Sequence, residues 1–337
     1  MLLTQLVDIR YLSGFTGSAG IMVLTRSGAA FFTDGRYAQQ ARAEVAGVDK
    51  IVSEGNPLLR ALEATKRDKA RTVGLDFAHL PVASFRQIQQ QLGKRVTLKD
   101  LSGMIEGLRA IKDADEISRI RLAVNMGAAL FPTALKHIRP GARESQIAAE
   151  IEYEARRRGA EGMSFETIVA GGARSALPHG RATNQRLPRR GFVVLDFGVI
   201  LTGYCSDMTR TVHVGKADAG ACRMYDAVLR AQVAAIKKVG PGVAVSAVDG
   251  AARGILDRAG FGQYFTHSTG HGVGLEIHEA PRIASGQSQK LQPGMVVTVE
   301  PGVYVPGVGG VRIEDMVLVT DRGREVLTPA TKKLITI

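Results

Sequence analysis

The sequence predicts an α+β protein of two domains, in which the second and larger domain consists of two similar halves. Three observations support this prediction. The chain of 337 residues is long for a single domain, its first hundred residues alternate short strands and helices, and the rest contains an internal repeat. Hydrophobic residues make up 45% of the chain and charged residues 23%, a composition that excludes disordered and fibrous proteins.

Residues 1–105 are expected to form a smaller α/β domain. Apolar runs at 20–24 and 29–32 lie on either side of a short polar turn, a pattern that indicates a hairpin. Further patterns predict helices at 37–45 and 83–92 and a strand at 72–75. Residues 100–113 carry two glycines and mixed charge, which is typical of a connector, so we place the domain boundary inside this segment, after residue 105.

The larger domain, residues 106–337, opens with a long helical pattern behind two candidate capping residues, Asp113 and Asp115. An internal repeat follows this helix. Pro140-Gly141 and Pro241-Gly242, 101 residues apart, each begin a segment of helical periodicity that ends at a glycine. Each segment is followed by a histidine-bearing loop and a pair of strands. The domain is therefore expected to be a pseudo-twofold pair of helix-plus-hairpin halves.

Each predicted strand pair carries two carboxylates. Asp196 and Glu300 stand near the ends of the outgoing strands, and Asp207 and Glu314 stand on the returning strands. Because a hairpin pairs residues that are symmetric about its turn, we expect Asp196 opposite Asp207 and Glu300 opposite Glu314. Acidic residues are depleted from strands, and burying an unpaired charge costs several kcal/mol. A pair of divalent cations would compensate four such charges, whereas the alternative is that each carboxylate points to solvent.

Histidines gather beside these carboxylates. The segment 267–279 contains His267, His271 and His278, with glycines in alternation at 270, 272 and 274. This pattern predicts an extended, closely packed backbone, and it matches neither a dinucleotide fingerprint nor the helical zinc-protease motif. His179 occupies the loop before the first hairpin. Carboxylates with imidazole suit manganese, cobalt, iron or zinc, and two such ions about 3.5–4 Å apart activate water, so the constellation indicates hydrolysis.

This set of residues resembles the dinuclear metal site of the pita-bread metallopeptidases. That family contains methionine aminopeptidase, Xaa-Pro aminopeptidase (aminopeptidase P), prolidase and the metal-free creatinases. The resemblance covers nearly the whole chain and points to the proline-peptidase branch. The motifs that carry it in the larger domain are Leu177-Pro178-His179-Gly180, Leu195-Asp196-Phe197-Gly198, Ser206-Asp207-Met208-Thr209-Arg210-Thr211, residues 267–278, Val299-Glu300-Pro301-Gly302 and Gly310-Val311-Arg312-Ile313-Glu314-Asp315.

The resemblance implies a pita-bread catalytic domain and a cage of five metal ligands. Asp196 would chelate one ion, Asp207 would bridge both ions, and His271 would bind the second. Glu300 and Glu314 would complete the cage, with Glu314 bridging and Glu300 also accepting the proton of the attacking water. The expected metal is Mn²⁺, with Co²⁺, Zn²⁺ or Fe²⁺ as alternatives.

The resemblance also assigns roles to residues that do not bind metal. His179, His267 and His278 would hold the substrate carbonyl and stabilise the oxyanion of the tetrahedral intermediate. Arg312 would orient a ligand carboxylate, the alternative being an ordinary surface cation on a strand. Cys205 shares a strand face with Asp207, and we interpret it as a packing residue.

The leading functional hypothesis is a Xaa-Pro aminopeptidase, which cleaves between an N-terminal residue and a following proline. The patterns at 272–280 and 304–310 favour this activity over the alternative, a prolidase that takes dipeptides only. An inactive pita-bread binding protein or a creatinase would lack metal ligands, and all five are present here. Methionine aminopeptidase is disfavoured because it normally lacks the N-terminal domain.

Composition bears on partners and compartment. The net charge of +12 raises the question of nucleic acid, but the basic residues are dispersed, aromatic residues make up 5%, and tryptophan is absent, so we expect no nucleic-acid partner. No apolar run is long enough to span a bilayer, and Asp8 interrupts any signal peptide, so we expect no membrane association. Two cysteines are too few to crosslink a chain of this length, so we expect free thiols and a location in the reducing cytoplasm. Family resemblance implies a homodimer.

The N-terminal motifs of the resemblance, Tyr11-Leu12-Ser13-Gly14-Phe15-Thr16-Gly17-Ser18 and Thr33-Asp34-Gly35-Arg36-Tyr37, resemble the first domain of the same family. Family members reach the first of these motifs only after an opening helix and strand, whereas here it begins about ten residues from Met1. We therefore expect a shortened domain that lacks its first strand, and the alternative explanation of the short N-terminus is a misassigned start codon or a truncated chain. The sheet edge so exposed would need to be covered by another segment or by a partner subunit.

Overall fold

The computed structural model describes residues 1–53 and 55–337. They form two compact units, unit 1 (Met1–Arg109) and unit 2 (Ala110–Ile337). The boundary that the sequence predicts after residue 105 falls inside helix α5 (Met104–Arg109). In the described ranges, no helix is both long enough and apolar enough to cross a membrane.

Unit 1 is built on a four-stranded sheet in the order β1-β2-β3-β4. Side chains alternate across it, as the two-residue period of a strand requires. Phe31 packs on one face with Leu3 and Met22, while Phe32 packs on the other face with Leu2 and Val23. The strands are β1 (Leu2–Leu3), β2 (Ile21–Leu24), β3 (Ala29–Asp34) and β4 (Asp49–Ser53), with β4 parallel to β3 and the others antiparallel. The predicted hairpin is thus confirmed as β2–β3.

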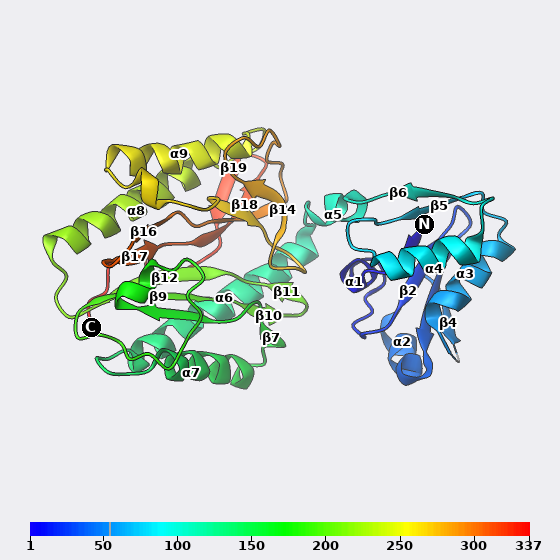
Figure 1. The fold of residues 1–337 in the computed structure, drawn as a ribbon, viewed down its shortest axis with the longest axis horizontal. Coiled ribbons are helices and arrows are strands. Elements are labelled where there is room, and N and C mark those ends of the chain that lie inside the picture. The colour runs from blue at the N-terminus through cyan, green and yellow to red at the C-terminus, as the bar shows by residue number, and fades with distance from the viewer. Residues whose placement is uncertain (54) are drawn as a thin grey trace. The chain divides into compact units, whose positions relative to one another are not determined.

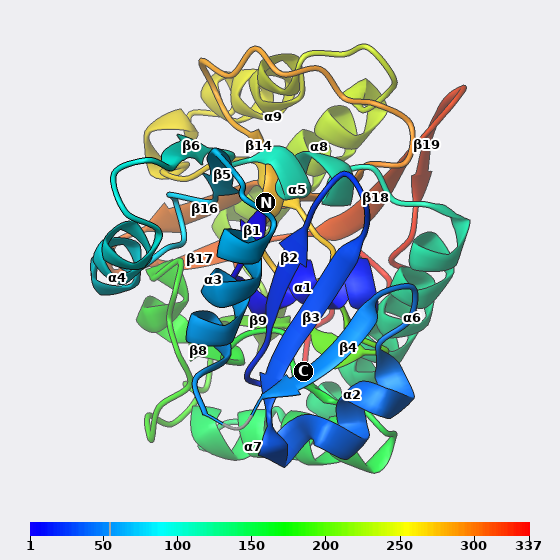
Figure 2. The same cartoon turned by 90° about the vertical axis from the view of Figure 1, so that its right-hand side faces the viewer.

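Helices cover both faces of this sheet, as Figure 2 shows for α3 and α2. The patterns at 37–45, 72–75 and 83–92 are confirmed as α2, β5 and α4. Two helices that the sequence analysis did not single out, α1 and α3, complete the unit, and α5 occupies the segment expected to be a connector. The elements are α1 (Leu6–Ser13), η1 (Gly35–Tyr37), α2 (Ala38–Glu44), α3 (Pro57–Arg67), β5 (Thr72–Leu75), α4 (Val82–Leu92) and β6 (Thr97–Asp100).

Contrary to the expectation that unit 1 lacks its first strand, a very short first strand is present. Strand β1 has two residues and lies at the edge of the sheet, where Leu2 is opposite Val23 and Leu3 is opposite Met22. The amino group of Met1 donates to the carbonyl of Leu24 at 2.7 Å and so extends the ladder by one bond. The edge strand is therefore present but very short, a common way to limit edge-to-edge pairing.

The first half of unit 2 places two helices against a three-stranded sheet in the order β12-β9-β8. The first helix begins with a capping box: Asp113 Oδ1 accepts from the amide of Glu116 at 2.9 Å, and Glu116 Oε2 accepts from the amide of Asp113 at 2.9 Å. Of the two predicted capping residues, Asp113 is the cap and Asp115 lies in the first turn. The elements are α6 (Ala114–His137), α7 (Glu144–Arg157), β7 (Gly162–Met163), β8 (Ile168–Gly171), η2 (Gly172–Ala176), β9 (Gly191–Phe197), β10 (Val199–Leu201), β11 (Tyr204–Cys205) and β12 (Met208–Val214).

The second half repeats this plan, as the sequence predicts. Helices α7 and α9 each contain 14 residues and begin at Glu144 and Val245, 101 residues apart. Figure 1 shows the strands of unit 2 between α6 and α7 on one side and α8 and α9 on the other. The elements are α8 (Ala219–Lys238), α9 (Val245–Arg258), η3 (Gly262–Tyr264), β13 (Gly270–Gly272), β14 (Glu279–Ile283), β15 (Val296–Val299), β16 (Gly302–Val305), β17 (Gly309–Arg312), β18 (Asp315–Thr320) and β19 (Gly323–Val326).

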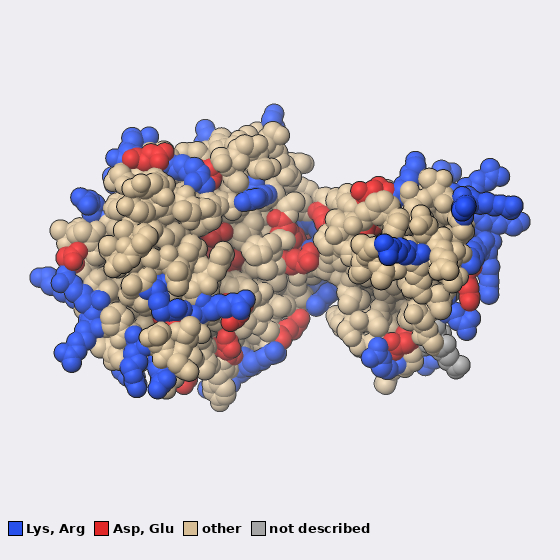
Figure 3. All heavy atoms as spheres, in the orientation of Figure 1, with Lys and Arg blue, Asp and Glu red and all other residues tan. Residues whose placement is uncertain are grey.

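The surface charge follows the dispersed pattern of the sequence. On the face of unit 2 that Figure 3 shows, Lys and Arg side chains occur in several separate places rather than in one stripe. The absence of a nucleic-acid partner stays a prediction.

Candidate metal centre

Four carboxylates stand where the strands of the two hairpins end or bend. Asp196 lies near the end of β9, Asp207 between β11 and β12, Glu300 directly after β15, and Glu314 between β17 and β18. Asp196, Asp207 and Glu314 are buried, and the side chain of Glu300 is 17% exposed. The four acids therefore lie at or next to strand ends, and they are directed inward rather than to solvent.

The second hairpin has the expected register. Val299 is opposite Asp315 and Gly302 is opposite Arg312, so the register between these pairs places Glu300 opposite Glu314. The two acids lie at the step from the β15–β18 ladder to the β16–β17 ladder, where the regular backbone pairing is interrupted. Their side chains consequently share one face of the hairpin.

The predicted register of the first hairpin is wrong by two residues. Asp196 is opposite Thr209, not Asp207. The reason is the turn: Thr202 and Gly203, with φ of 50° and 85°, form a two-residue connection between Leu201 and Tyr204, and symmetry about this turn selects Thr209. Asp207 is a diagonal neighbour of Asp196 on the same face, so the two acids still converge.

The structure brings an imidazole to these carboxylates. His271, Asp207 and Glu314 each offer a ligand atom, and these atoms all lie within 4.8 Å of one another. His271 Nε2 is 3.6 Å from Asp207 Oδ2 and 3.5 Å from Glu300 Oε1. His271 Nδ1 lies 3.0 Å from the carbonyl of Gly272, and donation to this carbonyl leaves the Nε2 lone pair directed at the acids.

Close packing of glycines makes this approach possible. The predicted extended backbone at 270–272 is confirmed as β13. A Cβ on Gly270 would lie 2.0 Å from the carbonyl oxygen of Thr298, and one on Gly272 would lie 2.2 Å from the carbonyl oxygen of Ala280. Only glycine permits such contact, so these residues allow the backbone of His271 to lie close between β15 and β14.

Three buried carboxylate oxygens have no hydrogen-bond partner among the described residues: Asp196 Oδ1, Asp207 Oδ1 and Glu314 Oε1. Burial, and then the neighbouring carboxylates, raise the pKa values of Asp207 and Glu314 well above the ordinary range. Burial likewise raises the pKa of Glu300 to about 7 and lowers the pKa of His271 to about 4. A neutral imidazole facing unpartnered carboxylate oxygens fits divalent cations, which would supply the missing positive charge.

Arg312 connects the carboxylates to a wider network. Its Nη2 donates to Asp196 Oδ2 at 2.6 Å, and its Nε donates to Thr209 Oγ1 at 3.1 Å. The Thr209 hydroxyl in turn donates to Glu314 Oε2 at 2.7 Å. Each of the two acids therefore has one oxygen fixed by the network and one left for a cation.

The predicted non-ligand histidines lie around the same cavity, which has a volume of about 730 Å³. His179, His267 and His278 line it together with all four carboxylates. Burial and the nearby Arg312 lower the pKa of His267 to about 4, so this imidazole is neutral at physiological pH. The walls also include two apolar side chains, Phe165 and Ile277, and two cations, Arg181 and Arg282.

Tyr304 is a site residue that the sequence analysis missed. Its hydroxyl lies 2.8 Å from His267 Nε2 and accepts from Arg312 Nη1 at 2.7 Å, so it joins the histidine to the arginine. The available signal was its position on the strand that follows Pro301-Gly302, directly across from residues 309–312. Cys205 is buried, as expected for a packing residue.

These features define a two-domain hydrolase with a carboxylate-rich centre in the larger domain, and comparison with known proteins agrees. The family model described as metallopeptidase family M24 matches residues 118–321, and the creatinase/prolidase N-terminal domain matches residues 1–111. The chain belongs to this metallopeptidase family, and the predicted pita-bread fold and proline-peptidase branch are confirmed.

Three relatives illustrate the similarity. The solved Xaa-Pro dipeptidase from Bacillus anthracis has a TM-score of 0.96 and 40% identity, covering 100% of this chain and 94% of that chain. The Xaa-Pro dipeptidase of Pyrococcus horikoshii is 35% identical over 99% of this chain and 94% of its own length. The solved X-Pro aminopeptidase from Thermotoga maritima has a TM-score of 0.93 and 34% identity, covering 100% of this chain and 97% of that chain.

Proposed function

We propose that this metallopeptidase is a Xaa-Pro dipeptidase, which hydrolyses dipeptides that end in proline. The sequence patterns favoured an aminopeptidase P. Relatives named Xaa-Pro dipeptidase, at 35% and 40% identity over nearly the whole chain, support the alternative more strongly. The observation that supports a metal-dependent hydrolase is the cluster of unpartnered carboxylate oxygens that face a neutral imidazole.

Five residues would hold two divalent ions: Asp196, Asp207, His271, Glu300 and Glu314. Two bound ions supply Lewis acidity, which lowers the pKa of a water and polarises the scissile carbonyl. Glu300 lines the cavity beside the other expected ligands, where its carboxylate would accept a proton from the attacking water and later return it to the leaving nitrogen. Arg312 keeps Asp196 in place through its 2.6 Å bond, consistent with its predicted positioning role.

The histidines would act on the substrate. His179 and His278 are exposed on the cavity wall and can donate to the carbonyl oxygen as it becomes an oxyanion. His267 is oriented on both sides, with Nδ1 2.7 Å from the carbonyl of Ser268 and Nε2 2.8 Å from the Tyr304 hydroxyl. Its contact with substrate would therefore require Nε2 to exchange the tyrosine for the peptide.

The cations on the cavity wall bear on the length of the substrate. A dipeptide places its free carboxylate one residue beyond the scissile bond, where a longer peptide has a neutral amide. Arg181 already pairs with Glu166 at 2.9 Å, whereas Arg282 is exposed on β14, in the ladder position opposite His271. Arg282 is therefore the better candidate to bind the carboxylate of a dipeptide.

The test compares Ala-Pro with Ala-Pro-Ala after metal-free enzyme has been loaded with Mn²⁺, Co²⁺ or Zn²⁺. A dipeptidase hydrolyses Ala-Pro at least tenfold faster, as kcat/KM, and Arg282→Gln raises KM for the dipeptide while Arg181→Gln changes it little. Preference for the tripeptide would establish the aminopeptidase instead. The same titration identifies the best metal, and sedimentation of the full chain tests the predicted homodimer.

A further inference from the structure

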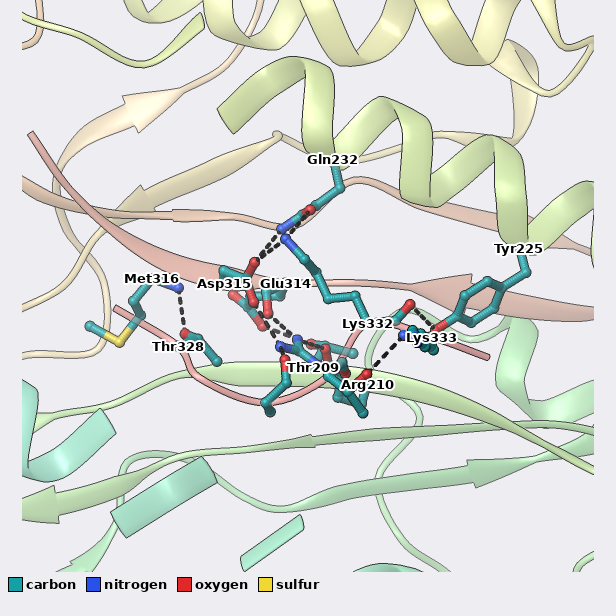
Figure 4. Close-up of polar contacts among 12 residues, drawn as sticks. Thr209, Arg210, Tyr225, Gln232, Glu314, Asp315, Met316, Thr328, Lys332 and Lys333 are labelled. Carbon is teal, nitrogen blue, oxygen red and sulfur yellow. Dashed lines mark hydrogen bonds and ion pairs between the residues drawn. The ribbon is translucent and has the colours of Figure 1, made fainter. Parts of the chain in front are cut away.

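A second charged cluster lies behind the metal centre and is formed around Asp315, the residue that follows Glu314. The side chain of Asp315 is fully buried and accepts from three side chains (Figure 4). Arg210 Nη2 donates at 2.8 Å, Gln232 Nε2 at 2.9 Å and Lys332 Nζ at 2.7 Å. Lys332 also donates to Gln232 Oε1 at 3.1 Å, which closes the cluster.

Arg210 uses all five of its N–H donors within this cluster. Besides Asp315, its guanidinium donates to four carbonyl oxygens, those of Thr209, Glu314, Ala330 and Thr331. One side chain thus joins the strand that follows Asp207, the backbone of Glu314 and the C-terminal segment. The two strands that it joins, β12 and β18, begin directly after the two expected bridging ligands, Asp207 and Glu314.

The C-terminal segment, residues 328–337, is hydrogen-bonded to these strands, and we call it the strap. The Thr328 hydroxyl accepts from the amide of Met316 at 3.0 Å, and the Tyr225 hydroxyl donates to the carbonyl of Lys332 at 3.1 Å. Further along, the amide of His213 donates to the carbonyl of Ile335, and the amide of Ile337 donates to the carbonyl of His213. Lys332 is the residue whose side chain reaches inward from the strap to Asp315, as Figure 4 shows.

Stability alone gives little reason for this arrangement. Buried ion pairs often stabilise a fold no better than apolar side chains of similar size, because removing the charges from water is costly. The bonds of this cluster, however, end on Glu314 itself: Arg210 holds its carbonyl, and Thr209, whose own carbonyl Arg210 also holds, donates to its carboxylate. The cluster therefore fixes both ends of one ligand residue.

We infer that the Lys332–Asp315–Arg210 cluster positions Glu314 for the metal pair, and that Lys332, a strap residue, is a positioning residue of the metal centre. This inference rests on the metal centre proposed above. Groups that orient metal ligands from behind usually contribute a factor of about 10–100 to metal affinity. Loss of the Lys332 ammonium group should leave Asp315 less firmly held. The backbone of Glu314, the residue before Asp315, should then be less firmly held as well.

The experiment compares Lys332→Met with Lys333→Met, which removes the same charge from the adjacent, exposed residue. Metal-free full-length protein is titrated with Co²⁺ by calorimetry, and the visible spectrum of Co²⁺ reports the geometry of its ligands. Lys332→Met should weaken the more weakly bound ion by about 10–100-fold and alter the Co²⁺ spectrum, and Lys332→Arg should restore both. Lys333→Met should match the parent.

Thermal unfolding of the Lys332→Met variant distinguishes a role in positioning Glu314 from a role in the stability of the fold alone. A merely structural role lowers the unfolding midpoints of the metal-free and Co²⁺-loaded proteins equally. Positioning instead shrinks the difference between them, because a weaker ion stabilises the folded state less. If Lys332→Met does not fold, Gln232→Met removes a neutral donor from the same carboxylate and is judged by the same criterion.

The outcomes distinguish this inference from the function it rests on. A parent protein that does not bind two Co²⁺ ions contradicts the proposed metal centre. A parent that binds two, with Lys332→Met or its replacement within twofold of Lys333→Met in affinity and spectrum, overturns the positioning role alone.

Discussion

Individual side chains determine what the centre can bind. In Asp196 and Glu314, one carboxylate oxygen is held by a hydrogen bond and the other is available to a cation. Asp196 gives Oδ2 to Arg312 and leaves Oδ1 unpartnered, and Glu314 gives Oε2 to Thr209 and leaves Oε1 unpartnered, among the residues the structure describes. Bonds to one oxygen fix the direction of the other. The centre is thus organised for cations before any cation binds.

The first prediction concerns Asp207. Replacing it by Asn removes one charge from a buried, mutually repelling set, so metal-free Asp207→Asn should unfold at a higher temperature than the metal-free parent. The same variant should bind fewer than two ions and show no measurable hydrolysis of Xaa-Pro peptides. Elemental analysis, calorimetric unfolding and a peptidase assay check the three statements. Full metal content with parental activity would show that Asp207 is not a ligand.

The second prediction separates the wall histidines from the ligands. His179→Ala and His278→Ala should retain both ions and lose turnover by a factor on the order of 10²–10³, the typical effect of removing an oxyanion donor. His271→Ala, by comparison, should lose metal. Metal contents measured side by side with kcat decide between the roles, and depletion of metal in the first two variants would make those histidines ligands.

At the level of elements, the sequence predicted the parts of the fold that local rules control. Helical periodicity and terminal glycines located α7 and α9, and alternating glycines predicted the extended backbone of β13. The helix α5 was missed because six residues containing Gly107 give too short a pattern to detect. The register of the first hairpin was assigned wrongly although the turn at Thr202-Gly203 was expected correctly, because symmetry about that turn makes Thr209, and not Asp207, the partner of Asp196.

The site shows a corresponding limit. The acids and histidines were visible in the sequence because charged residues are unusual in strands. Tyr304 and the cluster around Asp315 were not, because a tyrosine in a strand is ordinary and Lys332 lies 122 residues from Arg210, its counterpart across Asp315. Contacts between segments so distant in sequence follow from tertiary packing and leave no local pattern.

The third prediction tests a glycine that shapes the first hairpin. A Cβ at Gly198 would lie 1.7 Å from the carbonyl oxygen of Ser206, the residue before Asp207, so Gly198→Ala must push the two strands apart. It should lower the free energy of unfolding by about 1–3 kcal/mol or more, as overpacking does, and lower metal affinity as well. The matched control is Gly250→Ala in α9, where no atom lies within 4 Å, and this change should leave metal binding intact and raise stability by about 0.5–1 kcal/mol. Equal behaviour of the two variants would contradict the close contact.

For the whole molecule, the metal centre makes folding depend on pH. Burial raises the pKa of Glu300 to about 7, so the folded metal-free protein keeps this proton between pH 4.5 and 7, while the unfolded chain has lost it. The unfolded state then binds fewer protons, and stability from this group falls as pH rises through that window. Buried His267 and His271, with pKa values lowered to about 4, act in the opposite sense, because the unfolded state binds more protons between pH 4 and 6.5.

The fourth prediction isolates Glu300 from the histidines by comparing two metal-free proteins that share them. Glu300→Gln cannot ionise, so its stability relative to the parent should rise between pH 4.5 and 7, by on the order of 3 kcal/mol. Denaturant unfolding at half-unit intervals of pH measures this difference. Saturating Mn²⁺ should reverse its sign at pH 7.5, because the parent then gains the binding energy of a complete cage and the variant does not. If the difference in unfolding free energy between Glu300→Gln and the parent stays constant from pH 4.5 to 7, Glu300 is ionised throughout this range. If saturating Mn²⁺ leaves that difference unchanged, Glu300 contributes nothing to metal binding.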